Sequence, residues 1–286
     1  MKQVMFFFVL IFFSYVSLGQ QETDSSLFTL AKYNHILAGL SLDTLHGKIT
    51  VLYSRNYEVR AKSIELLIEN CIRFYERKFP GTIFETQIVL IDSAAWKRIS
   101  MEGPEELPPY GMPNNNSVIN KIFIAADKKA VARLFGQTDS LPDSVLSIFD
   151  NVALHELGHI FLINLKHTHF EERWMNEFLA SYFAICFLEE IHSKNGLPRV
   201  DLSAYQPHYK SLEDFQHLYG QMDGPNFAWY HGKFTELGYE LYPKYKTDLL
   251  NIFISSQSVS GKNPDPLTLL KQLAPVIANQ WIAEMK

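Results

Sequence analysis

The sequence predicts an α+β fold with a mixed sheet-plus-helix lobe in its N-terminal half and a mainly helical lobe in its C-terminal half. Short apolar, strand-like runs around one long helical pattern fill the first half, and hydrophobic residues recur at helical spacing from residue 143 onward. Strands followed by helices are typical of α+β proteins. The 286 residues, 47% of them hydrophobic, are enough to bury a large core. We expect a cleft between the lobes, near residues 145–180.

The first residues have the pattern of a secretory signal peptide, which we predict over residues 1–19. A lysine at position 2 precedes an almost wholly apolar run over 4–16, and the small residues Ser17 and Gly19 follow it. This run is too short for a typical membrane span and has the flanks of a cleaved signal. An uncleaved anchor helix is the alternative. The pattern therefore predicts export to the periplasm or the cell exterior, with no membrane span after signal cleavage.

In the N-terminal lobe, we expect strands over 47–53, 86–91 and 118–125 and a long helix over 57–79. Residues 103–116 are rich in proline, glycine and asparagine, so we expect a loop there.

In the C-terminal half, the helical patterns cover 143–165, 172–193, 211–220, 226–242, 245–256 and 266–284. The whole mature chain, residues 20–286, is expected to form a single domain. Its sheet lobe would cover about 45–165 and its helical lobe about 166–286.

Composition gives no reason to expect nucleic acid as a partner, because 31 acidic residues outnumber 26 basic ones and the net charge is −5. Cys71 and Cys186 lie in helical patterns, and the sequence leaves open whether they pair. Neither belongs to a Cys-x-x-Cys or Cys/His cluster, so a thiolate zinc site is not favoured. The oligomeric state is also left open.

The segment His155-Glu156-Leu157-Gly158-His159 is an H-E-x-x-H motif within an apolar helical run. Residues four apart share one face of a helix, so His155 and His159 can reach one metal ion. Glu156 can then act as general base on a water molecule. The alternative is an ordinary helix with two surface histidines, but the apolar surroundings favour buried histidines that need partners.

On the next helical pattern, residues 174–181 read Trp-Met-Asn-Glu-Phe-Leu-Ala-Ser. The H-E-x-x-H motif followed by this N-E-x-x-A segment resembles the gluzincin metallopeptidases, the group that contains thermolysin and aminopeptidase N. The resemblance implies a zincin-like fold, one Zn²⁺ per chain and Glu177 as the third ligand beside His155 and His159. Glu171 and Glu172 compete for that role, although charges at a helix start explain them better.

The expected order of strands and long helix before the motif also resembles these peptidases, in which an edge strand binds the backbone of a peptide substrate. The aminopeptidase branch carries a G-x-M-E-N motif, whose glutamate captures the amino group of the substrate. The nearest segment here is Tyr110-Gly111-Met112-Pro113-Asn114, with proline in place of the glutamate. The choice between endopeptidase and aminopeptidase therefore stays open.

Gluzincins also place a tyrosine or histidine on a later helix, where it stabilises the oxyanion. Residues 228–234, which contain Tyr230 and His231, resemble that segment. Tyr230 is the first candidate and His231 the second, since either side chain can donate a hydrogen bond to an oxyanion. The alternative is an aromatic helix that only packs the helical lobe.

The resemblance therefore predicts an exported zinc metallopeptidase that hydrolyses a peptide or protein substrate, with Glu156 as general base. A protein of another class stays open beside it: a non-catalytic secreted binding or structural protein on a zincin scaffold, in which the metal only stabilises the fold.

Overall fold

The computed structural model describes residues 32, 34–82, 84–102, 114–116, 121–134, 144–165, 170–193, 196–197, 206–257 and 265–285. The predicted signal peptide over 1–19 and the segment 110–113 lie outside the described residues.

The N-terminal half contains a five-stranded sheet with the strand order β1-β2-β3-β5-β4. The three central strands are parallel to one another, and each edge strand is antiparallel to its neighbour. In chain order the strands are β1 (Asp43–His46), β2 (Thr50–Tyr53), β3 (Gln87–Ile91), β4 (Asn114–Asn116) and β5 (Lys121–Ala125).

The three predicted strands are confirmed as β2, β3 and β5, with shorter bounds. β1, a mostly exposed edge strand, was not expected from the sequence. The loop expected over 103–116 is wrong at its end, where Asn114–Asn116 form β4. Three asparagines have low strand propensity, so pairing with β5 and not local preference accounts for this strand.

Both faces of the central strands are buried, which explains their continuous apolar runs. Ile88 and Leu90 point into one core cluster with α2 (Glu58–Lys78) and α5 (Ser144–Asn164). Val89 and Ile91 point into a second cluster on the other face. That face is covered by residues of α3 (Ser93–Glu102) and α4 (Lys128–Leu134), two short helices that were not expected from the sequence.

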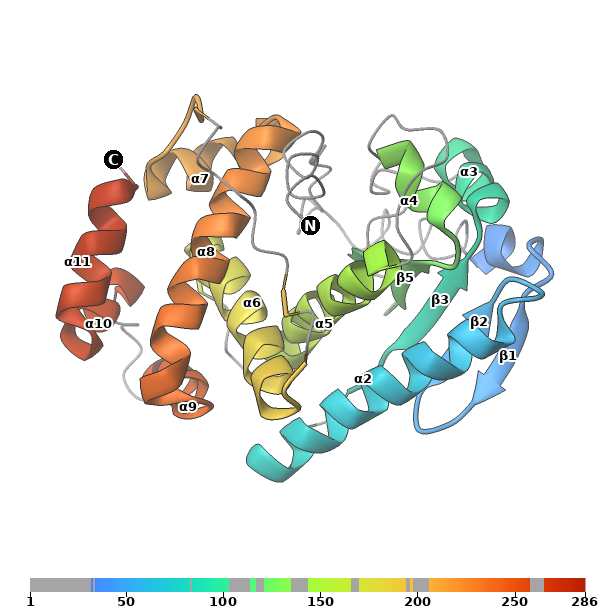
Figure 1. The fold of residues 1–286 in the computed structure, drawn as a ribbon, viewed down its shortest axis with the longest axis horizontal. Coiled ribbons are helices and arrows are strands. Elements are labelled where there is room, and N and C mark those ends of the chain that lie inside the picture. Colours follow the sequence, from blue (N-terminus) through green and yellow to red (C-terminus); the bar gives the residue numbers. More distant parts are fainter. Residues whose placement is uncertain are drawn as a thin grey trace.

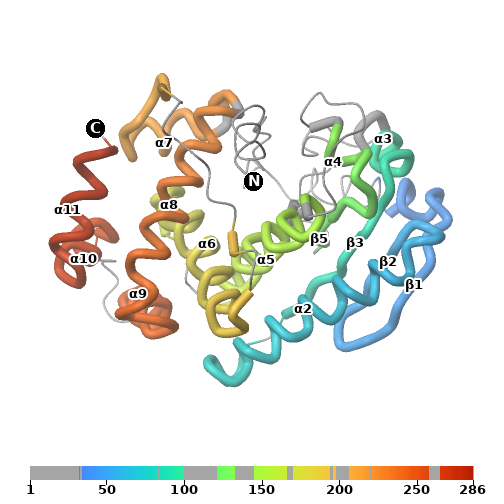
Figure 2. Tube along the Cα trace, in the orientation of Figure 1, coloured from blue at the N-terminus to red at the C-terminus, as the bar shows by residue number. Residues whose placement is uncertain are grey.

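The C-terminal half is helical, and α5 connects it to the sheet (Figures 1 and 2). The remaining helices are α6 (Arg173–Glu190), α7 (Leu212–Leu218), the 3₁₀ helix η2 (Tyr219–Gln221), α8 (Gly224–Tyr245), α9 (Asp248–Gln257), α10 (Pro266–Leu273) and α11 (Pro275–Glu284). The helix expected over 266–284 is two helices, because Pro275 lacks the N–H that would continue the first.

Helix α5 lies at the centre of the molecule, between the sheet and α6. Among the described residues, it is the one helix long and apolar enough to cross a membrane, but its packing in the core accounts for this composition. One cluster of buried side chains extends from β2 and α2 through α5 and α6 to α8, α9, α10 and α11. The α+β class predicted from the sequence is therefore confirmed.

The two cysteines are free thiols, and both are buried. Burial raises the pKa of each thiol, which keeps both protonated and unreactive. Between their helices, the ring of Tyr75 in α2 stacks on Phe183 in α6 at a centroid distance of 3.7 Å.

Candidate metal centre

Two histidines from α5 and one glutamate from α6 form a compact triangle of ligand atoms. His155 Nε2 lies 3.1 Å from His159 Nε2 and 3.2 Å from Glu177 Oε2. The third side, from His159 Nε2 to Glu177 Oε2, measures 3.3 Å. The structure thus brings together the three residues that the sequence assigned as ligands.

The triangle has the size and the donor types that zinc requires. Zinc bonds of about 2.0–2.2 Å at tetrahedral angles place neighbouring ligand atoms about 3.3–3.6 Å apart. The observed separations, between 3.1 and 3.3 Å, are close to that range. Two imidazole nitrogens and one carboxylate oxygen are also the usual protein ligands of a catalytic zinc, which keeps its fourth position open. These residues therefore fit a zinc ion.

Two hydroxyl groups bind the far sides of the ligands. Ser181 Oγ lies 3.0 Å from His155 Nδ1, which orients the ring so that Nε2 faces Glu177. The hydroxyl of Tyr219, in η2, donates to Glu177 Oε1 at 2.5 Å. Contacts of this kind fix the orientation of metal ligands. Neither hydroxyl was among the site residues expected from the sequence; the i, i+4 spacing of Glu177 and Ser181 could have indicated Ser181, whereas no local pattern marks Tyr219.

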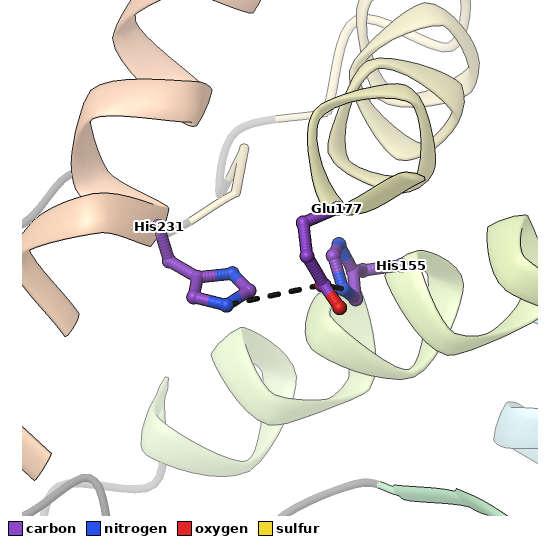
Figure 3. Close-up of side chains that lie close together, drawn as sticks. All are labelled: His155, Glu177 and His231. Carbon is purple, nitrogen blue, oxygen red and sulfur yellow. Dashed lines mark hydrogen bonds and ion pairs between the residues drawn. The ribbon is translucent and has the colours of Figure 1, made fainter. Parts of the chain in front are cut away.

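His231 approaches the same carboxylate from α8 (Figure 3). Its Nε2 lies 3.8 Å from Glu177 Oε2, and one ligand atom each from His155, Glu177 and His231 lie within 4.8 Å of one another. That nitrogen is buried, and none of the described residues forms a hydrogen bond with it. His231 is thus more distant than His159, but its Nε2 lies beside the triangle.

Tyr230, the first sequence candidate for the oxyanion role, does not reach the ligands. Its side chain is fully buried, and its hydroxyl donates to the carbonyl of Ser211 at 2.8 Å. Its ring packs on Phe215 with a centroid distance of 4.8 Å. The structure brings His231, the second candidate, to the ligands instead. Residues 230 and 231 are adjacent on a helix, about 100° apart, so only one of them can point at a given site.

Glu156 is half-buried on α5 between the two histidine ligands in sequence. Burial disfavours a charge on His159, but the carboxylates of Glu177 and then Glu156 outweigh it and raise its pKa to about 9. Burial also raises the pKa of Tyr219 well above its usual value, and Glu177 and Glu156 add to this. The charge of Glu156 thus contributes to the raised pKa values of both residues.

The ionisation of the other site residues follows from their burial and mutual contacts. Burial favours the neutral form of Glu177, but His159 and the other histidines outweigh it and hold the pKa of this carboxyl well below its usual value. Burial lowers the pKa of His231 to about 4, against the attraction of Glu177. Near neutral pH, Glu177 is a carboxylate and His231 a neutral imidazole.

The competing glutamates lie at the start of α6, as the sequence predicts. Glu171 is exposed and Glu172 is the N-cap residue, and no ligand contact of either is among the described interactions. Asn176, the residue before Glu177, also makes no described contact with the side chains of the ligands. Its side-chain amide donates to the carbonyl of Phe170 at 2.8 Å and accepts from the N–H of Phe170 at 3.2 Å, so it holds the turn before α6.

Compared with known proteins, the chain matches no family model, no curated protein and no solved structure.

Proposed function

We propose that the protein is a zinc-dependent hydrolase that cleaves peptide bonds, with a zincin-like fold and the site between α5, α6 and α8. The observation that carries this proposal is the triangle of His155, His159 and Glu177, whose ligand atoms lie 3.1–3.3 Å apart, with Glu156 next to His155 in the same helix. A structural zinc site is a closed cage of four ligands and needs no such glutamate.

His155, His159 and Glu177 would hold the metal. A zinc ion held there would lower the pKa of a bound water to about 7 and would polarise a carbonyl group. The carboxylate of Glu156 would take a proton from the attacking water as the water oxygen adds to the carbonyl carbon of the peptide. Glu156 then delivers that proton to the nitrogen of the leaving amine as the C–N bond breaks. His231, in its Nε2–H form, donates a hydrogen bond to the carbonyl oxygen, where negative charge develops.

The edge strand β4 supports a peptide as the substrate. Asn114–Asn116 pair with β5 on one side, and no strand among the described residues pairs with the other side. This strand also contacts α5, the helix of the two histidines. An extended peptide can add to such an edge through main-chain hydrogen bonds, which would place it beside the motif helix.

A digest of a peptide library, read by mass spectrometry, tests this function. We expect cleavage by the purified protein, loss of cleavage with a zinc chelator and recovery on adding zinc. The cleavage sites would also separate an endopeptidase from an aminopeptidase. Unchanged cleavage after complete removal of the metal would contradict the proposal.

His231 gives a specific reason to keep a second candidate, a non-catalytic secreted binding or structural protein. Its Nε2, which forms no hydrogen bond within the described part of the chain, lies near enough to His155 and Glu177 to complete a four-ligand cage with His159. In that case His231→Ala would release the metal. If His231 acts on the substrate, the same variant would keep its zinc and lose most of the hydrolysis rate.

We also propose that the protein is exported, because of the signal-like pattern over 1–19. Cell fractionation tests this: the full chain should appear outside the cytoplasm in a shortened form, and a chain that lacks residues 2–19 should stay inside.

A further inference from the structure

The two oxygens of the Glu177 carboxylate have different surroundings. Oε2 faces the imidazoles, at 3.2 Å from His155, 3.3 Å from His159 and 3.8 Å from His231. Oε1 points away from them and accepts the hydroxyl of Tyr219 at 2.5 Å. Only Oε2 therefore faces the space that a metal ion would fill.

The ring of Tyr219 is held on several sides. The guanidinium of Arg173 lies over it at 5.3 Å from the ring centroid. Phe215 and Phe227 pack against it edge-on, with centroid distances of 5.0 and 5.4 Å. Phe227 also packs on His231 at 4.3 Å, so one aromatic group supports both residues that approach Glu177 from the helical lobe.

The backbone around Tyr219 is tied to the helix that carries Glu177. Gln216, in α7, accepts from the N–H of Arg173 at 2.7 Å and donates to the carbonyl of Glu171 at 3.1 Å. At its start, α7 has a capping box between Ser211 and Asp214, which fixes where the helix begins. The segment that carries Tyr219 is therefore held against the start of α6, and this fixes the position of the Tyr219 hydroxyl.

A carboxylate can bind a metal through one oxygen or through both. When both bind, the ligand fills an additional coordination position. A hydrogen bond to one oxygen competes with its bond to the metal. We infer that Tyr219 is a positioning residue, whose hydroxyl engages Oε1 of Glu177, limits that ligand to one metal bond through Oε2 and so keeps a coordination position free for water. This inference rests on the proposed metal site, and Tyr219 itself touches no substrate in it.

The test compares Tyr219→Phe with Tyr182→Phe in the full chain. Tyr219→Phe keeps the ring and its packing and removes only the hydroxyl. Tyr182 is the matched control, because it is a buried tyrosine on α6 whose hydroxyl donates to the carbonyl of Lys246 at 2.7 Å, away from the metal ligands. Zinc affinity is measured by competition with a chelating dye, and the coordination number by the visible absorption of the Co²⁺-loaded protein.

For Tyr219→Phe, we expect one zinc per chain at saturation, with a dissociation constant raised about 10–100-fold, as is typical for loss of a residue that orients a ligand. We also expect weaker Co²⁺ absorption bands, since a second bond from Glu177 would raise the coordination number from four to five. Tyr182→Phe should leave both measurements as in the wild type. A fall in kcat with little change in KM would fit the same role.

A second variant separates the hydrogen bond from the nearby charge. Arg173→Met removes the cation over the ring and keeps the hydroxyl, so it should weaken zinc binding less than Tyr219→Phe does. An equal or larger effect of Arg173→Met would overturn the inference. An unchanged zinc affinity and Co²⁺ spectrum in Tyr219→Phe would also overturn it. The same holds if Tyr182→Phe loses as much zinc affinity as Tyr219→Phe does. A wild-type protein that binds neither metal would instead refute the proposed function.

Discussion

Gly158, in the middle of α5, lies directly against the backbone of Ala180 in α6. A Cβ atom on Gly158 would lie 2.8 Å from the carbonyl oxygen of Ala180 and 2.9 Å from its Cα. Gly158 stands between the two histidine ligands in sequence, and Ala180 follows Glu177 by nearly one helical turn. The close approach of the two helices therefore also sets the separation of the ligand atoms.

Gly158→Ala should both destabilise the protein and weaken zinc binding. The added methyl group would meet backbone atoms, which cannot rotate away, so the two helices must separate. We expect a loss of about 1–3 kcal/mol in the free energy of unfolding, despite the higher helix propensity of alanine. Urea unfolding of the metal-free protein and a zinc titration measure the two effects.

Gly238→Ala is the matched control. In α8, a Cβ on Gly238 would come closest to Cδ1 of Ile185, at 2.6 Å, and the end of that side chain can move; Cδ2 of Tyr182, at 3.6 Å, would be in ordinary contact. Zinc affinity should stay at the wild-type value and the loss of stability should be smaller. Equal effects of the two substitutions would mean that the contact of Gly158 does not position the ligands.

Glu177→Ala should lose most of the bound zinc, because two protein ligands hold a catalytic zinc poorly. Glu171→Ala and Glu172→Ala are controls that remove the same charge near the start of the same helix. Metal analysis after dialysis against a weak chelator gives the zinc content of each. A larger loss in either control than in Glu177→Ala would show that the ligand assignment is wrong.

Glu156→Gln should separate metal binding from catalysis. Glutamine keeps the size of the side chain but cannot accept the proton of the water. We expect peptide cleavage to fall by at least about 10²–10⁴-fold, the usual cost of losing a general base. Zinc content and melting temperature should stay near the wild-type values. Loss of zinc in parallel would assign Glu156 a structural role instead.

Arg60→Met should destabilise the protein in a pH-dependent way. The guanidinium of Arg60 binds Asp150 at 2.6 and 3.0 Å, and both side chains are largely buried. Loss of one partner from a buried pair costs about 3–5 kcal/mol. Burial already raises the pKa of Asp150 against the effect of Arg60, and the substitution should raise it further.

The sign of the pH effect follows from that raised pKa. A folded state that binds the proton more tightly than the unfolded state loses stability as the pH rises through the folded pKa. The free energy of unfolding of Arg60→Met should therefore fall furthest below that of the wild type near about pH 7.5, and less far near about pH 5. Urea unfolding at the two pH values measures this difference. Lys62→Met, in the exposed pair with Glu58, should have little effect at either pH. A pH-independent loss in Arg60→Met would contradict this account.

Local patterns were sufficient for the parts of the site that lie on regular helices. The spacing of His155 and His159 depends only on helix geometry, and Glu177 shares a face with Ser181 for the same reason. The long apolar runs of β3 and β5 likewise identified buried strands. These predictions needed no knowledge of which elements meet.

The other features of the site and of the sheet depend on tertiary packing, which local sequence does not show. Tyr219 and Tyr230 are both tyrosines in helical segments of the second half, and nothing in their local sequence shows which one meets Glu177. That depends on how α7 docks on the start of α6, through Gln216. Similarly, β4 consists of asparagines that form a strand only because β5 lies beside them. The zincin-like fold itself stays a prediction.

The central position of α5 would link metal binding at the proposed site to the stability of the whole chain. The helix packs on the sheet and on α6 within one continuous core, so His155 and His159 cannot move away from Glu177 without disturbing both halves. Any ligand that binds only the folded state stabilises it, by about 2.7 kcal/mol when its free concentration is about 100 times the dissociation constant. The ion would thus act as a cross-link between α5 and α6, and its removal should lower the unfolding temperature of the sheet and of the helices together.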